Sequence, residues 1–256
     1  MTSVSLTQHS LIGTISLQRS QTHNALDGGM ITALQSAIEK AIADPQIQIL
    51  LLQGDGKHFC AGADLHWMLH MAEAPWAENL NDATRLAQLL YTWHHCPKLT
   101  VCSVQGAVYG GAAGLVAASD MVIASEDARF CFSEVKLGLI PAVISPYVVR
   151  AIGARLTQYY AMTATPFSAS QALAMHLIHY QVTATERQKF TETTLQNLLA
   201  NAPHAVQACK KLISHVAPMP ITENIIHETA HMLATIRMQE EAQQRIHTFL
   251  TSTKKG

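Results

Sequence analysis

Short apolar runs constrain this chain of 256 residues more than any other feature. The runs at 47–53 (IQILLLQ), 99–106 (LTVCSVQG) and 120–125 (DMVIAS) have the length of strands and are mostly apolar. Runs of this kind are typical of strands that are covered on both faces. Because predicted helices alternate with them, the sequence predicts an α/β fold.

Local signals predict most of the other elements. Residues 3–18 alternate apolar and polar side chains around a turn near Ser10, which predicts a hairpin. Asp27 is expected to cap a helix that ends near Ala43. The remaining predicted helices are a short one within 109–120 and longer ones at 77–95, 145–162, 168–176 and 185–200.

The character of the sequence changes near residue 195. Strand signals stop there, and the stretches 202–215 and 222–250 are amphipathic helices in their apolar spacing. The sequence therefore predicts a core at 1–195 and a helical region at 196–256, without an internal repeat or a low-complexity linker.

Composition excludes several classes of partner. The net charge is -1, and no cluster of basic residues precedes the tail, so nucleic acid and acidic membrane surfaces are not expected partners. Charged residues make up 14% of the chain, well below the roughly 25% of an average soluble domain. A surface with so little charge suggests burial between subunits.

The sequence also predicts the compartment. No apolar run approaches the ~20 residues of a membrane helix, and the N-terminus resembles neither a signal nor a transit peptide. The five cysteines are odd in number and form no C-x-x-C pair, which is typical of reduced, mostly buried thiols. A cytoplasmic protein is expected.

Two turns of small residues follow predicted strands. One lies within 56–65 (GKHFCAGADL) and the other within 109–114 (YGGAAG). The second is not a nucleotide-binding loop, because Ala112 stands where a P-loop has its lysine. The glycines could simply allow close helix packing. Together, however, two such turns can each aim one backbone N–H at a common oxygen, and one such donor is worth ~3 kcal/mol of transition-state stabilisation.

Five stretches of the chain resemble, in order and spacing, the enoyl-CoA hydratase/isomerase (crotonase) family. They are HNAL (23–26), FCAGADL (59–65), QGAVYGGAAGL (105–115), DMVIASEDARF (120–130) and SEVKLGLIP (133–141). The resemblance implies a crotonase-like spiral of ββα units with a C-terminal helical trimerisation region. It also implies an acyl-CoA thioester substrate, no cofactor apart from the coenzyme A of that substrate, and a homotrimer or a dimer of trimers.

The same resemblance implies the site residues. The backbone N–H groups of Ala63 and Gly111 would form an oxyanion hole for the thioester carbonyl, and Glu134 would be the catalytic acid and base. The positions implied for coenzyme A and substrate contacts are Ala25, Ala61, Gly62, Asp64, Leu65, Tyr109, Gly110 and Pro141.

One position departs from the family pattern. Family hydratases usually carry a second glutamate on the helix after the glycine turn, where this chain has Gly114. The space left there is expected to admit water or a polar group of the substrate. Glu134 lies among Phe132, Val135 and Leu137, whose apolar character is expected to raise its pKa.

Because the second glutamate is missing, two hypotheses about the enzymatic activity remain. A single carboxylate suits a 3,2-enoyl-CoA isomerase, which moves one proton. The stretches 132–153 and 64–68, however, are similar to bacterial methylglutaconyl-CoA hydratases of leucine breakdown, a subgroup that can carry glycine at this position. We therefore expect an enoyl-CoA hydratase of that type, with Arg85 and Lys136 as candidates to bind a distal carboxylate, and the isomerase or a non-catalytic CoA-binding relative as alternatives.

A rival from another class is the H-E-x-x-H match at 227–231 (HETAH). In zinc peptidases this spacing places two histidine ligands on one helix face, with the glutamate as base. No other feature of such enzymes accompanies the match, and the sequence does not identify a third ligand, for which Glu241 and His247 are examples of candidates. The expectation is that the chain has no metal site.

Overall fold

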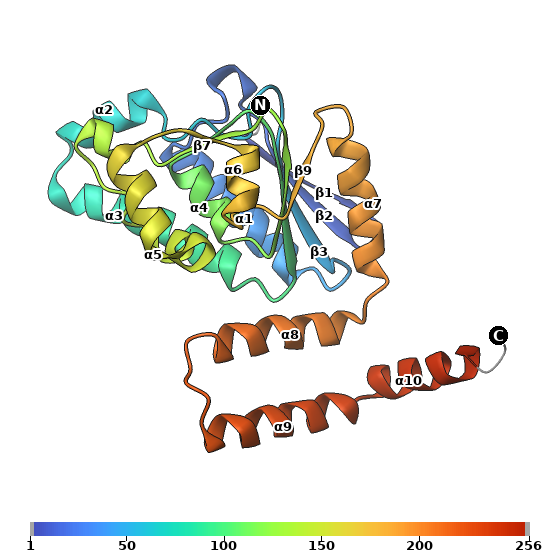
Figure 1. Cartoon of the computed structure of the whole chain (residues 1–256). Helices are drawn as coiled ribbons and strands as arrows, with labels where there is room; N and C mark the ends of the chain where they lie inside the picture. The colour runs from blue at the N-terminus through green and yellow to red at the C-terminus, as the bar shows by residue number, and fades with distance from the viewer. Residues whose placement is uncertain (1–2, 254–256) are drawn as a thin grey trace. The chain divides into compact units, whose positions relative to one another are not determined.

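The computed structural model describes residues 3–253 (Figure 1). The chain divides into two compact units, Met1–Leu195 and Gln196–Gly256. The strands are β1 (Val4–His9), β2 (Ile12–Leu17), β3 (Ile49–Gly54), β4 (Leu99–Val104), β5 (Ala107–Tyr109), β6 (Met121–Ser125), β7 (Arg129–Cys131), β8 (Phe167–Ser168) and β9 (Tyr180–Val182).

Most helices belong to the first unit. They are α1 (Gly28–Ala43), α2 (Leu65–Glu73), α3 (Trp76–His94), α4 (Gly111–Ala117), α5 (Ser145–Thr163) and α6 (Ala169–Ala174), with α7 (Arg187–Leu199) running across the boundary. Short 3-10 helices lie at η1 (Ser20–Thr22) and η2 (Glu134–Leu137). The second unit contains α8 (Pro203–Val216), α9 (Glu223–Arg237) and α10 (Glu240–Thr253).

The main sheet has six strands in the order β1-β2-β3-β4-β6-β9. Only the β1–β2 hairpin is antiparallel, and every other neighbouring pair is parallel. The hairpin turns at Ser10, and Asp27 caps α1 by accepting a hydrogen bond from the N–H of Met30. The α/β fold, the hairpin and the capped helix are confirmed.

The predicted strand at 99–106 is confirmed as β4, which ends at Val104. Gly106, whose φ is 56°, then turns the chain out of the main sheet, so that β5 begins a second sheet with β7 and β8. A side chain at Gly106 would also collide with the carbonyl oxygen of Lys57, 2.2 Å from an added Cβ. The predicted helix at 145–162 likewise bends at Gly153, where the backbone is not helical.

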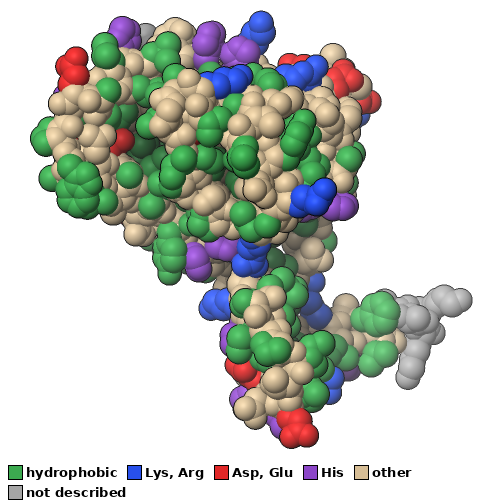
Figure 2. All heavy atoms as spheres, turned by 60° about the vertical axis from the view of Figure 1, so that its left-hand side comes forward, with side chains coloured by type: hydrophobic (Ala, Val, Ile, Leu, Met, Phe, Trp, Pro, Cys, Tyr) green, Lys and Arg blue, Asp and Glu red, His purple; other side chains and the backbone are tan. Residues whose placement is uncertain are grey.

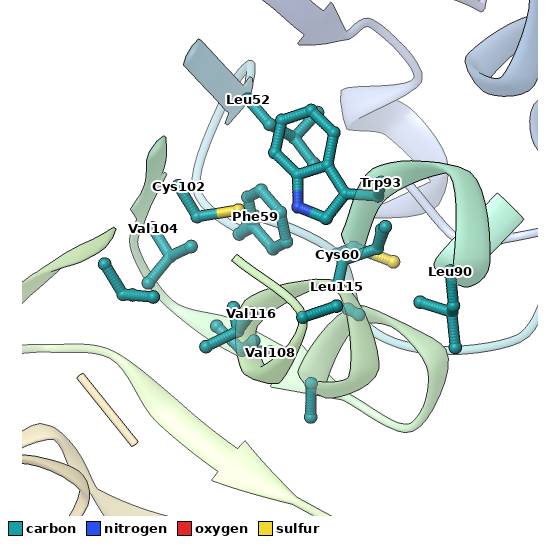
Figure 3. Close-up of a cluster of buried hydrophobic side chains, with 14 of the residues drawn as sticks. Leu52, Phe59, Cys60, Leu90, Trp93, Cys102, Val104, Val108, Leu115 and Val116 are labelled. Carbon is teal, nitrogen blue, oxygen red and sulfur yellow. The ribbon is translucent and has the colours of Figure 1, made fainter. Parts of the chain in front are cut away.

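A buried cluster joins the main sheet to the helices that follow it (Figure 3). Its largest side chain, Trp93 of α3, is fully buried and donates a hydrogen bond to Ser119 at 2.8 Å. Around it lie Leu52, Phe59, Cys60, Leu90, Cys102, Val104, Val108, Leu115 and Val116. Since Cys60, Val108 and Leu115 flank the two turns of small residues, the turns are anchored in this core.

The second unit differs from the first in burial. None of the residues of α8 and α9 is buried, and large apolar side chains are exposed, including Ile221 (89%) and Met238 (76%). Across the described part of the chain, no helix combines the length and apolarity that crossing a bilayer requires.

Candidate active site

The two turns of small residues lie side by side. Cys60 donates from its N–H to the carbonyl of Ala107 at 3.0 Å, and Tyr109 donates to the carbonyl of Cys60 at 3.1 Å. Two residues after Cys60, a Cβ added to Gly62 would lie 3.5 Å from the Cβ of Tyr109. The chain segments that lead into both turns are therefore paired directly.

The first turn places the N–H of Ala63. Leu26 and Ala63 form a short parallel bridge, in which Leu26 donates to the carbonyl of Gly62 and accepts from the N–H of Asp64, both at 2.8 Å. In a parallel bridge the residue between the two bonded positions directs its own N–H to the other side. The N–H of Ala63 thus points away from Leu26.

The second turn depends on Gly110. Its φ of 53° and ψ of -121° lie where only glycine is unstrained, and its N–H donates to the carbonyl of Cys131 at 3.0 Å. Gly111 is the first residue of α4, so its N–H has no partner within the helix. An added Cβ on Gly111 would lie 2.9 Å from Leu26, the residue that also pairs with Ala63.

Glu134 lies against this second turn. The strand β7 pairs with β5 so that Cys131 is opposite Tyr109, and Glu134 begins η2 three residues later. A Cβ on Gly110 would lie only 3.4 Å from Oε1 of Glu134. Oε2 is buried and has no hydrogen-bond partner within the described residues. Burial raises the pKa of the Glu134 carboxyl above its usual range.

The source of that burial differs in part from the sequence prediction. Phe132 is buried as expected, whereas Val135 and Leu137 are 37% and 57% exposed. Both side chains lie on η2 and neither is buried, so their apolar character does not account for the burial of the carboxylate. The contact of the carboxylate with the Gly110 turn is a tertiary feature that the local sequence does not show.

The space at Gly114 is filled, so the prediction of room for water there is wrong. A Cβ at this position would lie 2.4 Å from Cγ2 of Ile144, 3.0 Å from its Cβ and 3.2 Å from Cδ1 of Leu90. Ile144 precedes α5 and is 2% exposed. The side chain of a residue 30 positions away therefore occupies the place where family hydratases carry a second carboxylate.

The other residues implied as substrate contacts lie on several elements. Ala61 donates from its N–H to the carbonyl of His23 at 3.0 Å, beside the buried Ala25. Asp64 caps α2, and Leu65, the first residue of that helix, is 77% exposed. Pro141 lies in the loop between η2 and α5, where its carbonyl accepts from Ser145.

Sequence reasoning missed Arg19 and Asn24. The side chain of Arg19 binds the carboxylates of both Asp27 and Asp64, which cap α1 and α2. Asn24 is fully buried and links the loop at 19–24 to the carbonyls of Asp55 and His58. The available signal was an arginine at the end of an apolar strand, followed by two aspartates at predicted helix starts.

The two candidates for a distal carboxylate differ in their surroundings. Arg85 is held by Asp82 at 3.1 Å, and the Trp67 indole donates to the same carboxylate oxygen at 3.3 Å. Trp67 also packs on Gly28 of α1, which makes it part of the packing between α1, α2 and α3. Lys136 is exposed and lies on η2 with Glu134.

The H-E-x-x-H match lies on α9, as predicted, but its glutamate contacts a histidine of another helix. Glu228 pairs with His215 of α8 at 3.0 Å. Residues 3–253 contain no group of three or more histidine, cysteine, aspartate or glutamate side chains placed to hold a metal ion.

Known proteins share this architecture over most of their length. The family described as enoyl-CoA hydratase/isomerase matches residues 7–255. A Legionella pneumophila protein described as an enoyl-CoA hydratase/isomerase (crotonase) is 41% identical, with a TM-score of 0.95 over 98% of this chain and 97% of the other. A Thermus thermophilus protein described as an enoyl-CoA hydratase is 30% identical over 79% of this chain and 80% of its own length. The trans-2-decenoyl-[acyl-carrier-protein] isomerase of Streptococcus mutans is 29% identical over 79% and 78%. The chain therefore belongs to the enoyl-CoA hydratase/isomerase family.

Proposed function

We propose that this protein transfers a proton next to the thioester carbonyl of an acyl-CoA, and that its reaction is hydration of the 2,3 double bond of an enoyl-CoA. The observation that carries the proposal is the contact between Glu134 and the Gly110–Gly111 turn. A basic carboxylate beside an unpaired helix N–H can act on a carbonyl compound whose oxygen that N–H holds.

The proposed hydration uses one carboxylate twice. Glu134 accepts a proton from water as the water oxygen bonds to C3 of the enoyl group. The electrons of the double bond move toward the thioester, and the N–H groups of Ala63 and Gly111 stabilise the resulting enolate oxygen. Glu134 then returns the proton to C2, so that one water adds across the bond on one face.

A second candidate function is 3,2-enoyl-CoA isomerisation. The observation that favours it is the contact of Ile144 with Gly114, which leaves no room for a second acid. Here Glu134 would remove a proton from C2 of a 3-enoyl-CoA and return it to C4, moving the double bond to the 2,3 position. Both reactions share the enolate and the same carboxylate.

The similarity of 132–153 and 64–68 to methylglutaconyl-CoA hydratases supports hydration as the first choice, and the relatives include both activities. The 41% and 30% identical proteins are described as a hydratase/isomerase and a hydratase, whereas the isomerase from Streptococcus mutans is 29% identical. For the acyl group we propose a branched, carboxylate-bearing chain of the methylglutaconyl type, as in leucine breakdown. Lys136 would bind the distal carboxylate, because Arg85 is already paired with Asp82.

Three CoA esters separate these proposals. Purified protein is assayed with methylglutaconyl-CoA, crotonyl-CoA and a 3-enoyl-CoA, with product identified by mass and by retention time. Addition of water to methylglutaconyl-CoA in preference to crotonyl-CoA supports the proposal. Migration of the double bond without addition of water to either 2-enoyl ester would establish the isomerase instead.

The raised pKa of Glu134 predicts a pH dependence. Since the carboxylate is the reactive form, activity should fall as the pH drops through the raised pKa, by about tenfold per unit below it. Burial favours the neutral form of the Glu134 carboxyl. This group therefore contributes folding stability that is fully present below the ordinary glutamate pKa and is lost as the pH rises through its pKa in the folded protein. The rate profile of the wild type should therefore have an acid limb above pH 4.5, the ordinary value.

We also propose that copies of this chain assemble into a trimer or a dimer of trimers. Figure 2 shows hydrophobic side chains scattered over the visible surface, and the second unit exposes apolar side chains along its helices. Exposed apolar area on this scale is typical of interfaces. Light scattering that gave a monomer mass at micromolar concentration would contradict the assembly.

For the compartment we propose the cytoplasm, because the cysteines are free and mostly buried.

A further inference from the structure

The Arg19 guanidinium joins the starts of two helices. Its Nη1 donates to Asp27 and, at 3.4 Å, to the carbonyl of Ala25, and its Nη2 donates to Asp64 at 3.2 Å. The three side chains are 13–25% exposed. A planar guanidinium can hold two carboxylates in a fixed relation, which a lysine ammonium cannot do as well.

Each of these carboxylates also holds a helix. Asp27 accepts from the N–H of Met30 at 2.6 Å at the start of α1. Asp64 accepts from the N–H groups of His66 and Trp67 at 3.0 and 3.2 Å at the start of α2. Two carboxylates this close would repel each other without the cation between them. Arg19 thus fixes α2 relative to α1.

The backbone of Arg19 is fixed in turn by Asn24. The Asn24 side-chain oxygen accepts from the backbone N–H of Arg19 at 2.8 Å, and the backbone N–H of Asn24 donates to the carbonyl of Arg19 at 2.9 Å. The side-chain amide nitrogen of Asn24 donates to the carbonyls of Asp55 and His58, both at 2.9 Å. Since Asn24 is fully buried, the loop that carries Arg19 is held to the segment between β3 and the first turn.

We propose that Arg19 is a positioning residue that aims the N–H of Ala63 at the substrate oxygen. The inference rests on the proposed function, in which that N–H is one of two oxyanion donors. Ala63 lies directly before Asp64, and the two hydrogen bonds of Leu26, which precedes α1, hold the same segment. Arg19 acts through Asp64 and does not itself contact the substrate, because its charge is already met by two carboxylates.

The test reads the oxyanion hole directly. The probe is the CoA thioester of 3-phenylpropenoic acid, whose absorption band moves to longer wavelength when its carbonyl oxygen accepts strong hydrogen bonds. Arg19→Lys keeps the positive charge and loses the planar set of guanidinium donors that holds two carboxylates. Asp64→Asn keeps a side-chain oxygen that can cap α2 and loses the negative charge. The control is Arg187→Lys on α7, since Arg187 is also partly buried and donates to one side chain, Ser103.

We expect Arg19→Lys to reduce the band shift to less than half and kcat by about tenfold, with KM within about threefold of wild type. Asp64→Asn should reduce the band shift as well. The double variant should show a band shift no smaller than that of the more affected single variant, because both substitutions act through one contact. Arg187→Lys should keep the full shift. If Arg19→Lys fails to fold, Asp64→Asn still decides the question.

Other outcomes overturn the proposal. A full band shift with a raised KM in Arg19→Lys would show that Arg19 binds the CoA moiety. A full shift with only a lower melting temperature would show a purely structural role. If the wild type binds the probe without any shift, or does not bind it, the proposed function itself fails, which is distinct from a shift that Arg19 does not control.

Discussion

The two turns of the candidate active site are held in place by different means. The turn at Ala61–Asp64 is tied down by polar contacts, namely the bridge to Leu26, the cap made by Asp64 and the guanidinium of Arg19. The turn at Gly110–Gly114 has no side-chain cap. Its shape depends on positions without side chains, where the backbone, Glu134 and Ile144 approach closely.

The difference implies different tolerance to substitution. A network of hydrogen bonds and charges can lose one member and keep its fold, since each contact is worth only about 0.5–3 kcal/mol. A turn built on close packing cannot accept even one carbon without displacing its neighbours. The glycine turn should therefore be the more sensitive of the two, in stability and in rate.

Gly114→Glu should have the largest effect. Its Cβ would overlap Ile144 and its carboxylate would be buried, which we expect to cost about 4 kcal/mol or more of unfolding free energy. Denaturant unfolding measures the loss. In Gly114→Ala, the further change Ile144→Ala should recover part of the stability, and failure of that rescue would show that the two side chains do not compete.

Glu134→Gln should have the next largest effect, on rate alone. The amide keeps the shape of the side chain and cannot accept a proton, so kcat should fall by ~100-fold or more while CoA-ester affinity stays nearly constant. Steady-state kinetics and a binding titration check both parts. A rate within threefold of wild type would move the proton transfer to another acid, for instance in the segment 73–82.

Gly110→Ala should be intermediate. The left-handed backbone would cost about 2 kcal/mol, and the new methyl group would crowd Oε1 of Glu134. Gly153→Ala is the matched control, because Gly153 also has a positive φ but no atom within 4 Å of its added Cβ. Both variants should lose melting temperature, and only Gly110→Ala should lose kcat. Equal kinetics would contradict the contact with Glu134.

Asp64→Ala should have the smallest effect on stability. Losing the cap of α2 and the pair with Arg19 should cost about 1–2 kcal/mol. Hydrogen exchange at the amides of His66 and Trp67 should report the loss locally, since these donate to Asp64. If exchange in Asp64→Ala increased throughout the protein and not only in α2, the Ala61–Asp64 turn would be as intolerant of substitution as the glycine turn.

Local signals explain what the sequence could predict. The caps of α1 and α2 depend on Asp27 and Asp64, whose acceptors lie within three residues of the donors, so the pattern is visible in a short window. The parallel strands β3, β4 and β6 were predictable because both of their faces are buried. The three-residue strands β5 and β7 were not, because a run so short has no readable period.

Tertiary contacts explain what was missed. Ile144 fills the space at Gly114 from 30 residues away, and Arg19 reaches Asp64 from 45 residues away. The sequence predicted an open space at Gly114 because it does not show which side chain fills that space. The position of Glu134 was predictable only from its motif, and its contact with Gly110 depends on the pairing of β5 with β7.

Deuterium incorporation tests the proton transfer by Glu134 most directly. The protein is incubated with crotonyl-CoA in D₂O, and deuterium at C2 of the product is read by NMR. If Glu134 moves a proton at C2 of a thioester held against the glycine turn, the wild type should give one deuterium at C2 with a single stereochemistry, and Glu134→Gln should form that product at least ~100-fold more slowly. Labelled product formed by Glu134→Gln at the wild-type rate would contradict it.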